Sequence, residues 1–543
     1  MILLPFVALI FVSDIWSYKE FVRAESYFAL GSRLMIEQDE WLAPHAPDER
    51  QLNKPPLTFW LIGFCYKLFG VNYGAARLPS VFAALAVLAI VYALGARLIG
   101  ISGGLMAAGT LASSYLFLTF ARTAMSDMLL TLFVTASFGC FLISLTSRST
   151  RYVLLGYMSL ALGVLTKGPV TLLLVGLPIA LMLVWSRDAQ AVKRLQLAKG
   201  LVLFLAIAAP YFGLIYFRLG TGPLNFFFLT ENLQRFTGSA YEGSRRPFWF
   251  EIPAFFSDFA PWSLLLIPAA WIDWHGRRTE EARTLATPLL YLWAGCAILL
   301  FSLSSFKLDY YLLPAVPAAA LIVGSVLSKT DRLRGLVRTV LQGLLVLIAG
   351  FLVVIALISL RAATLLSVTS TVRFAPLLLT AIGLGFVLWQ MSLKRLSKAV
   401  AAVMLIIWAT ILTAEIALMP AFARYLAVSQ LTSAVASDRV WYTSPATSNW
   451  ANDIAFNLSA SDRVTRLLAD TNNEQVLTAL EADPRAVVVI CEREYHELAR
   501  RDRAIQVLAS AETFGHGGLN LKLLRNPSPQ RLLVVTRSEG RTP

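Results

Sequence analysis

The chain has 543 residues, of which 57% are hydrophobic and 15% charged, and its mean hydropathy is +0.65. Soluble domains carry roughly 25% charged residues, so this composition excludes a disordered, collagen-like or ordinary soluble protein and indicates a membrane protein. Of the net charge of +14, residues 1–420 supply most, with 33 Lys and Arg against 20 Asp and Glu, while residues 421–543 carry 14 against 13. The positive charge therefore lies among apolar segments, which does not favour nucleic acid as a partner.

Thirteen apolar stretches are candidates for membrane spans, because a helix needs about 20 apolar residues to cross the hydrocarbon core. The first lacks a basic start and a small-residue cleavage site, so we interpret it as a retained span and not as a signal peptide. The stretches cover residues 1–16, 75–96, 101–120, 127–147, 152–167, 168–186, 200–218, 259–274, 286–304, 310–328, 339–360, 375–393 and 399–420.

The connecting loops predict the orientation of these spans. With a cytoplasmic N-terminus, the inside loops hold 17 Lys and Arg in 47 residues, and the outside loops hold 13 in 122. Inside loops are the richer in positive charge, so the asymmetry favours this orientation and places the C-terminus outside.

Two outside loops are long, 17–74 and 219–257, and both contain aromatic residues or amphipathic helical patterns that suit the membrane interface. After Pro420, short strands are expected at 440–442, 486–490 and 532–536, with helices at 474–482 and 492–502. The expected fold class is an α-helical polytopic membrane protein with about 13 spans and interfacial helices in the first outside loop. It comprises a transmembrane domain over 1–420 and a small extracytoplasmic α/β domain over 421–543.

Charged residues gather at the outside ends of the spans. A carboxylate near several cations at the lipid boundary suits a reaction on a lipid-linked phosphate, because cations stabilise the departing negative charge and a carboxylate accepts a proton. The plainer alternative is a set of snorkelling ends and structural ion pairs. The chain contains no P-loop, GxGxxG, HExxH or Cys/His ligand cluster, and Cys65, Cys140, Cys296 and Cys491 show no CxxC spacing.

An ordered set of motifs resembles the membrane-embedded C-type glycosyltransferases. The resemblance is to the branch that holds aminoarabinose–lipid A transferases and bacterial relatives of protein O-mannosyltransferases, and it covers roughly residues 18–320. Its motifs are Lys54-Pro55-Pro56-Leu57 with Trp60, Arg77-Leu78-Pro79-Ser80, Arg122 to Asp127, Leu165-Thr166-Lys167-Gly168-Pro169, Glu231-Asn232 with Arg235-Phe236, Arg246-Pro247-Phe248-Trp249, Pro261-Trp262 and Phe301-Ser302-Leu303-Ser304 with Lys307, Tyr311, Pro314 and Pro317.

The resemblance implies a polyprenyl-phosphate sugar donor, a glycolipid (lipid A-like) or protein acceptor, and no cofactor. It also implies a multi-pass protein of the bacterial cytoplasmic (inner) membrane with an extracytoplasmic active site. The chain departs from the family pattern where Ala24 and Asn53 replace acidic residues and where the His of the second long loop is absent. Without those ligands, we expect no metal site.

On this basis we expect Glu25 and Asp127 to be the catalytic carboxylates. The expected substrate-binding residues are Arg23, Lys54, Arg77, Arg122, Lys167, Arg235, Lys307 and Tyr311. Several have structural alternatives: Glu25 as a partner of Arg23, Asp127 as a helix cap, Tyr311 as interface packing. Two other functions stay open, namely a transporter or flippase of a lipid-linked substrate and an inactive scaffold of the same fold.

Overall fold

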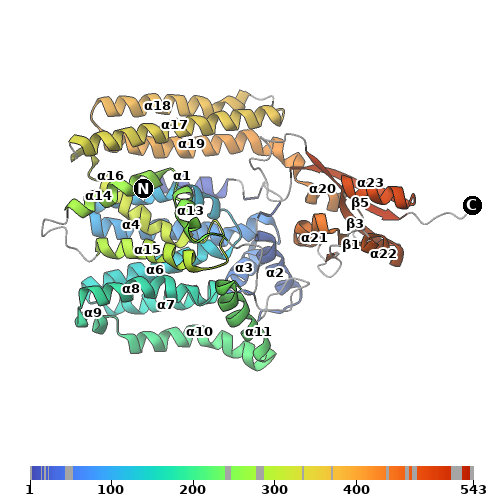
Figure 1. The fold of residues 1–543 in the computed structure, drawn as a ribbon, viewed down its shortest axis with the longest axis horizontal. Helices are drawn as coiled ribbons and strands as arrows, with labels where there is room; N and C mark the ends of the chain where they lie inside the picture. The colour runs from blue at the N-terminus through green and yellow to red at the C-terminus, as the bar shows by residue number, and fades with distance from the viewer. Residues whose placement is uncertain are drawn as a thin grey trace, which may run out of the picture.

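The computed structural model describes most of the chain, and most of what it describes is helical (Figure 1). Arg23, which was expected to bind substrate, lies outside the described residues. The described ranges are 3–13, 15–16, 20–22, 24–42, 53–238, 246–276, 286–332, 335–368, 371–435, 439–458, 464–466, 474–514 and 529–537.

Helices that run side by side form the body of the molecule (Figure 1), and each of the thirteen predicted apolar stretches overlaps at least one of them. Within the described ranges, six helical segments are long and apolar enough to cross a membrane, or seven if one bent pair counts as a single span. The protein is therefore a multi-pass membrane protein. The helices of the bundle are α1 (Leu3–Val12), α4 (Tyr73–Ala112), α5 (Tyr115–Phe120), α6 (Ser126–Ser147), α7 (Thr150–Lys167), α8 (Val170–Ser186), α9 (Ala189–Arg194), α10 (Leu197–Leu219), α14 (Leu266–Gly276), α15 (Ala286–Leu303), α16 (Val316–Leu327), α17 (Gly335–Leu365), α18 (Ala375–Ser392) and α19 (Leu396–Phe422).

Helix α4 contains a sharp break at Gly100, where φ is +84°. Glycine adopts this conformation without the steric cost of a side chain. A Cβ atom on Gly95 would lie 2.8 Å from the Cα atom of Gly104, so the two arms of α4 approach each other across the break. The break explains why one 40-residue helix covers two of the predicted apolar stretches.

The two long predicted loops contain short helices, of which Figure 1 places α2 (Glu25–Glu37), α3 (Leu57–Phe69) and α11 (Thr221–Asn225) at one end of the bundle. In the first loop, residues 25–37 and 57–69 are helical. In the second, a π-helical segment precedes a bent pair of helices. These elements are α2 (Glu25–Glu37), α3 (Leu57–Phe69), α11 (Thr221–Asn225), η1 (Phe226–Gln234), α12 (Arg235–Thr237), η2 (Phe248–Phe250), α13 (Glu251–Asp258) and η3 (Trp262–Leu265).

The C-terminal part contains a five-stranded sheet in the order β2-β1-β3-β5-β4. Strands β1, β2 and β3 are parallel, and β5 is antiparallel to both β3 and β4. The predicted strands lie within β1, β3 and β5, whereas the edge strands β2 and β4 were not predicted. The elements are β1 (Val440–Thr443), β2 (Val464–Arg466), β3 (Ala486–Cys491), β4 (Ile505–Thr513), β5 (Gln530–Arg537), α20 (Ala427–Ala434), α21 (Ala451–Leu458), α22 (Glu474–Ala482) and α23 (Glu492–Arg501).

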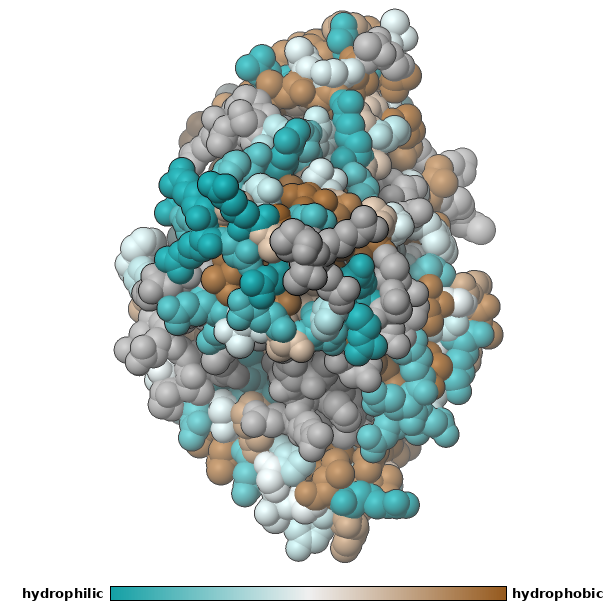
Figure 2. All heavy atoms as spheres, turned by 90° about the vertical axis from the view of Figure 1, so that its right-hand side faces the viewer, coloured by the Kyte–Doolittle hydropathy of each residue, from teal (hydrophilic) through white to brown (hydrophobic). Residues whose placement is uncertain are grey.

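The sheet and its helices lie against the same end of the bundle as the first loop (Figure 1). The Trp450 indole donates a hydrogen bond to Glu20 Oε1 at 3.1 Å, and the Asn457 amide donates to Tyr73 Oη at 2.7 Å. Figure 2 shows hydrophilic side chains spread over this end of the molecule. The C-terminal part therefore packs on the loop that carries several of the predicted site residues.

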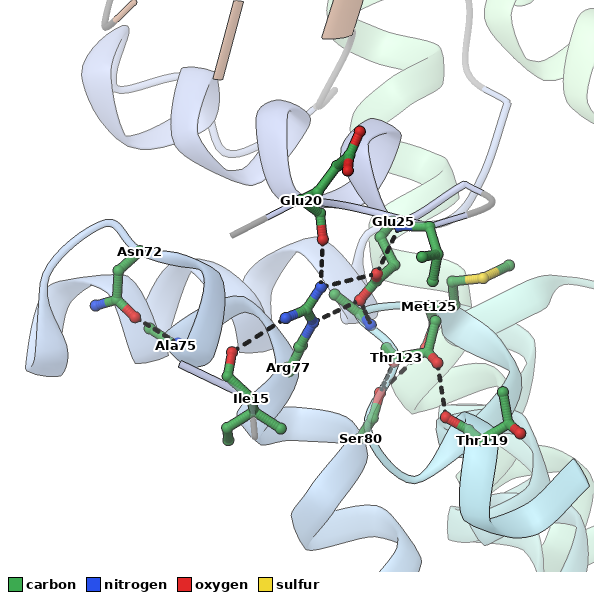
Figure 3. A network of polar contacts seen from close by, with 12 residues as sticks. Ile15, Glu20, Glu25, Asn72, Ala75, Arg77, Ser80, Thr119, Thr123 and Met125 are labelled. Atoms are coloured by element: carbon green, nitrogen blue, oxygen red, sulfur yellow. Dashed lines mark hydrogen bonds and ion pairs between the residues drawn. The ribbon is translucent and has the colours of Figure 1, made fainter. Parts of the chain in front are cut away.

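A buried ion pair ties the first loop to the bundle (Figure 3). The guanidinium of Arg77 on α4 donates from Nε to Glu25 Oε1 at 2.9 Å and from Nη2 to Glu25 Oε2 at 3.1 Å. It also donates to the carbonyl oxygens of Ile15 and Glu20. Both side chains are almost completely buried, with 3% and 0% of their surface exposed. The pair fixes the start of α2 against α4.

We predict that Arg77→Met destabilises the protein strongly, because it leaves the Glu25 carboxylate buried without its partner. Breaking a buried pair in this way costs about 3–5 kcal/mol. The matched control is Arg97→Met, at an exposed position of the same helix. Thermal unfolding in detergent measures both, and equal melting temperatures for the two variants would contradict the anchoring role.

Candidate active site

The turn between α7 and α8 places Lys167 at the end of its helix. Gly168, with φ of +92°, ends α7, and Pro169 precedes the first residue of α8. A Cβ atom on Gly168 would lie 2.6 Å from the ring of Phe227, so the second loop packs directly on this turn. A lysine in the last turn is also favoured by the negative end of the helix dipole.

Asp127 lies opposite, in the first turn of α6, where the helix dipole favours a carboxylate. Lys167 Nζ contacts Asp127 Oδ1 at 2.5 Å, and 3% of the Asp127 side chain is exposed. The other carboxylate oxygen of Asp127 makes no hydrogen bond to any residue that the structure describes. The ion pair leaves part of the Asp127 carboxylate available for another donor.

The second loop supplies a carboxylate that joins two cations. Glu231 lies in the π-helix η1, a form often found at functional sites. Its Oε2 accepts from Lys54 Nζ at 2.9 Å and from Arg235 Nη1 at 2.9 Å. Lys54 comes from the first loop, just before the two prolines that precede α3, so Glu231 connects the two loops.

Tyr311 completes the group. Arg235 Nη2 donates to Tyr311 Oη at 3.1 Å, and Lys167 Nζ lies 5.0 Å from the centre of the Tyr311 ring. The guanidinium of Arg235 also lies over the ring of Phe306, at 4.0 Å from its centre. Aromatic faces attract cations, so these rings stabilise the positive charges without neutralising them.

Apart from Asp127, which contacts the lining residue Lys167, these side chains line a cavity of about 380 Å³. Three cations and one carboxylate are in its wall, and much of the remaining surface is apolar. Of the side chains of Lys54, Lys167 and Arg235, 21%, 16% and 23% are exposed, so they are reachable from the cavity. Its lining residues are Lys54, Leu130, Lys167, Pro169, Val170, Leu173, Phe228, Glu231, Asn232, Leu233, Arg235, Phe236, Leu300, Phe301, Ser304, Phe306 and Tyr311.

The other expected site residues lie outside the lining of this cavity. Glu25 and Arg77 form the buried pair described above, and Arg122 forms an ion pair with Glu415 of α19. Lys307 is buried and donates to the carbonyl oxygen of Ser304, one of the lining residues. The structure thus brings Lys54, Asp127, Lys167, Arg235 and Tyr311 together and separates them from the rest.

Sequence reasoning assigned no role to Glu231, although it noted the Glu231-Asn232 motif. The signal that was available is the spacing of Glu231 and Arg235, because residues i and i+4 share one face of a helix. Glu415 was missed as well, since a single acid within an apolar stretch gives no indication of its partner.

The described side chains around the cavity do not form a suitable set of ligands for a metal ion. Within the described ranges, no three His, Cys, Asp and Glu side chains come together as metal ligands. Asn53 occupies the position where the family pattern has an acid, and an amide is a poorer ligand for zinc than a carboxylate.

Comparisons with known proteins agree with the motifs. The family model described as dolichyl-phosphate-mannose-protein mannosyltransferase matches residues 53–213. The undecaprenyl phosphate-alpha-4-amino-4-deoxy-L-arabinose arabinosyl transferase of Pseudomonas aeruginosa (strain LESB58) is 31% identical over 341 residues, which cover 61% of this chain and 60% of that protein. An uncharacterised protein of Aquifex aeolicus is 28% identical over 305 residues, which cover 56% of this chain and 59% of that protein. The chain thus spans about three fifths of the length of these relatives.

Solved structures extend the similarity to almost the whole fold. ArnT from Cupriavidus metallidurans, in the structure bound to undecaprenyl phosphate, has a TM-score of 0.72 at 19% identity, covering 98% of this chain and 97% of that one. The oligosaccharyltransferase of Archaeoglobus fulgidus in its apo form has a TM-score of 0.52 at 12% identity, and the match covers 91% of this chain and 70% of that one. The resemblance to the membrane-embedded glycosyltransferases, in the branch of the aminoarabinose transferases, is therefore confirmed in sequence and in fold.

Proposed function

We propose that this protein is an integral membrane glycosyltransferase that moves a sugar from a polyprenyl phosphate to a glycolipid or protein acceptor. The observation that carries the proposal is the cavity, in which Lys54, Lys167 and Arg235 face a space with largely apolar walls. Cations bind a phosphate, and the apolar walls suit the first part of a polyprenyl chain. The sequence similarity to undecaprenyl-phosphate arabinosyl transferases supports the same donor class.

The three cations would act on the leaving group. When the bond between the sugar and the phosphate breaks, negative charge grows on the phosphate, and prearranged cations stabilise it. In the structure these cations are paired with Glu231 and Asp127. These ion pairs hold the cations in place before the donor binds. A bound phosphate would then contact the cations alongside the carboxylates.

Of the two expected catalytic carboxylates, Asp127 suits proton transfer better. Both oxygens of Glu25 are occupied, by Arg77 and by the backbone N–H groups of Ala124 and Val22. Asp127 uses one oxygen for Lys167 and keeps the other for an acceptor hydroxyl. We therefore assign Asp127 as the general base for a hydroxyl acceptor and Glu25 as an anchor of the first loop.

The proposed topology has thirteen spans, with the N-terminus inside and the cavity and residues 421–543 outside the cytoplasmic (inner) membrane of a bacterium. Three features support the number: the break in α4, which gives two arms, the bent pair that contains α13 and α14, and the shorter apolar helices around α8, α15 and α16. The Lys and Arg asymmetry of the loops supports the orientation. The change of composition after Pro420 supports a boundary between a transmembrane domain and an extracytoplasmic α/β domain.

A transporter and an inactive scaffold are the competing functions. The carboxylates that pair with the three cations would serve a transporter equally well. An assay of sugar transfer with purified protein and a polyprenyl-phosphate sugar separates the enzyme from the other two. Transfer supports the enzyme, while donor binding without any transfer favours one of the others.

We predict that Lys54→Ala lowers sugar transfer by roughly 10²–10³-fold, because one charge-assisted contact to the phosphate is lost. Burial lowers the pKa of the Lys54 ammonium, and the carboxylate of Glu231 raises it in part. The wild type should therefore lose donor binding as the pH rises through this lowered pKa, whereas Lys54→Arg should retain it. The control is Lys67→Ala, an exposed lysine on α3. Equal transfer by Lys54→Ala and Lys67→Ala would remove Lys54 from the site.

We predict that Asp127→Asn lowers the rate of transfer without unfolding the protein, because it keeps the shape of the side chain and removes the base. If the acceptor is a hydroxyl, the loss should shrink as the pH rises, since the hydroxyl then ionises more easily. Asp188→Asn, at the cap of α9, serves as the control. Transfer rates across pH are measured with melting temperatures in parallel, and a wild-type rate for Asp127→Asn would contradict the assignment.

We predict that a cysteine at position 493 is labelled from outside and one at position 190 is not. Both residues are exposed, Arg493 on α23 and Gln190 on α9. The four native cysteines are replaced first, and a membrane-impermeant maleimide is added to cells with a permeabilised outer membrane. Lysed cells, in which both positions should react, provide the control. Labelling of position 190 alone in unlysed cells would show that the orientation is the opposite of the proposed one.

A further inference from the structure

Helix α13 begins with a buried carboxylate that has no hydrogen-bond partner among the described residues. The Glu251 side chain belongs to a fully buried residue, and neither of its oxygens forms a hydrogen bond with any described residue. The helix belongs to the bent pair Phe248–Asp258 and Trp262–Asp273, whose axes meet at 104°. Buried carboxylates are normally hydrogen-bonded, so this exception requires a reason.

A buried cation lies near it. Lys307 has 3% of its surface exposed and follows α15, and its ammonium donates to the carbonyl oxygen of Ser304. Burial lowers the pKa of this ammonium, and the carboxylate of Glu251 raises it. No direct ion pair within 4 Å joins the two among the described residues, so the attraction acts across a gap. Arg246 and Asp309 are the other charged groups that act on Glu251.

Lys307 does not line the cavity, but it belongs to a segment of which other residues do. The segment from 304 to 311 contributes Ser304, Phe306 and Tyr311 to the lining, and the ammonium of Lys307 holds the backbone of this segment at Ser304. An interaction that shifts the Lys307 side chain would therefore also shift the part of the cavity wall that faces Lys167 and Arg235.

We propose that Glu251 is a positioning residue of the transfer reaction, whose carboxylate attracts Lys307 and thereby holds the wall segment 304–311 against the phosphate site. This inference rests on the proposed function. Because Glu251 is not among the residues that line the cavity, it would act through Lys307 and not by touching the substrate. Two opposite charges without a direct contact stabilise a fold poorly, since desolvation costs more than the attraction returns. A role in the geometry of the site accounts for this arrangement better than a role in stability.

The test is a double-mutant cycle with Glu251→Gln, Lys307→Met and the double variant. Transfer is measured with a polyprenyl-phosphate sugar, and binding is measured separately with undecaprenyl phosphate. If Glu251 acts through Lys307, each single variant should lose about tenfold or more in kcat, and the double variant should lose no more than Lys307→Met alone. Losses that multiply in the double variant would overturn the proposal, as would wild-type turnover of Glu251→Gln.

The pH profile provides a readout that a purely structural role would not move. Without the carboxylate of Glu251, the pKa of Lys307 falls further, so the alkaline limb of kcat should shift to lower pH in Glu251→Gln. If this variant does not fold, Glu251→Asp carries the test, with partial activity and a smaller shift in the same direction expected. An unchanged alkaline limb would overturn the inference. The proposed function fails separately, by the absence of transfer in the wild type.

Discussion

The arrangement of the site depends on the compensation of charge inside a cavity with apolar walls. Lys54, Lys167 and Arg235 would repel one another if nothing lay between them, and Glu231 and Asp127 supply the opposing charge. These residues come from the first loop, the α7–α8 turn, the second loop and the start of α6. The carboxylates therefore assemble the site from four separate segments, and they hold the cations in place before any phosphate is bound.

The carboxylates of this end of the molecule have separate tasks. Glu25 is saturated by Arg77 and two backbone N–H groups, which suits an anchor. Asp127 retains an oxygen without a described partner and lies next to the cavity, which suits chemistry. Glu251 is buried and does not line the cavity, which suits the positioning role proposed for it through Lys307. Similar residues thus differ in role because their surroundings differ, which is a general feature of acid–base sites.

The sequence predicted the fold better than the site. Apolar length identified the helices, and the strands β1, β3 and β5 were predicted because each contains a short run of apolar, mostly β-branched or aromatic residues. Strand β4 was not, since its edge position leaves many of its residues exposed and polar. Of the site residues expected from the motifs, the structure brings together Lys54, Asp127, Lys167, Arg235 and Tyr311. The motif order could not show that Glu25 pairs with Arg77 or Arg122 with Glu415, because those partners lie 52 and 293 residues apart.

The central claim is that the three cations of this cavity hold a lipid-linked phosphate. The most direct measurement is an experimental structure of the protein with undecaprenyl phosphate in a lipid nanodisc. The account predicts density for the phosphate within hydrogen-bond distance of Lys54, Lys167 and Arg235, with the lipid chain along the apolar wall. A phosphate bound elsewhere, with these cations still paired only to Glu231 and Asp127, would contradict it.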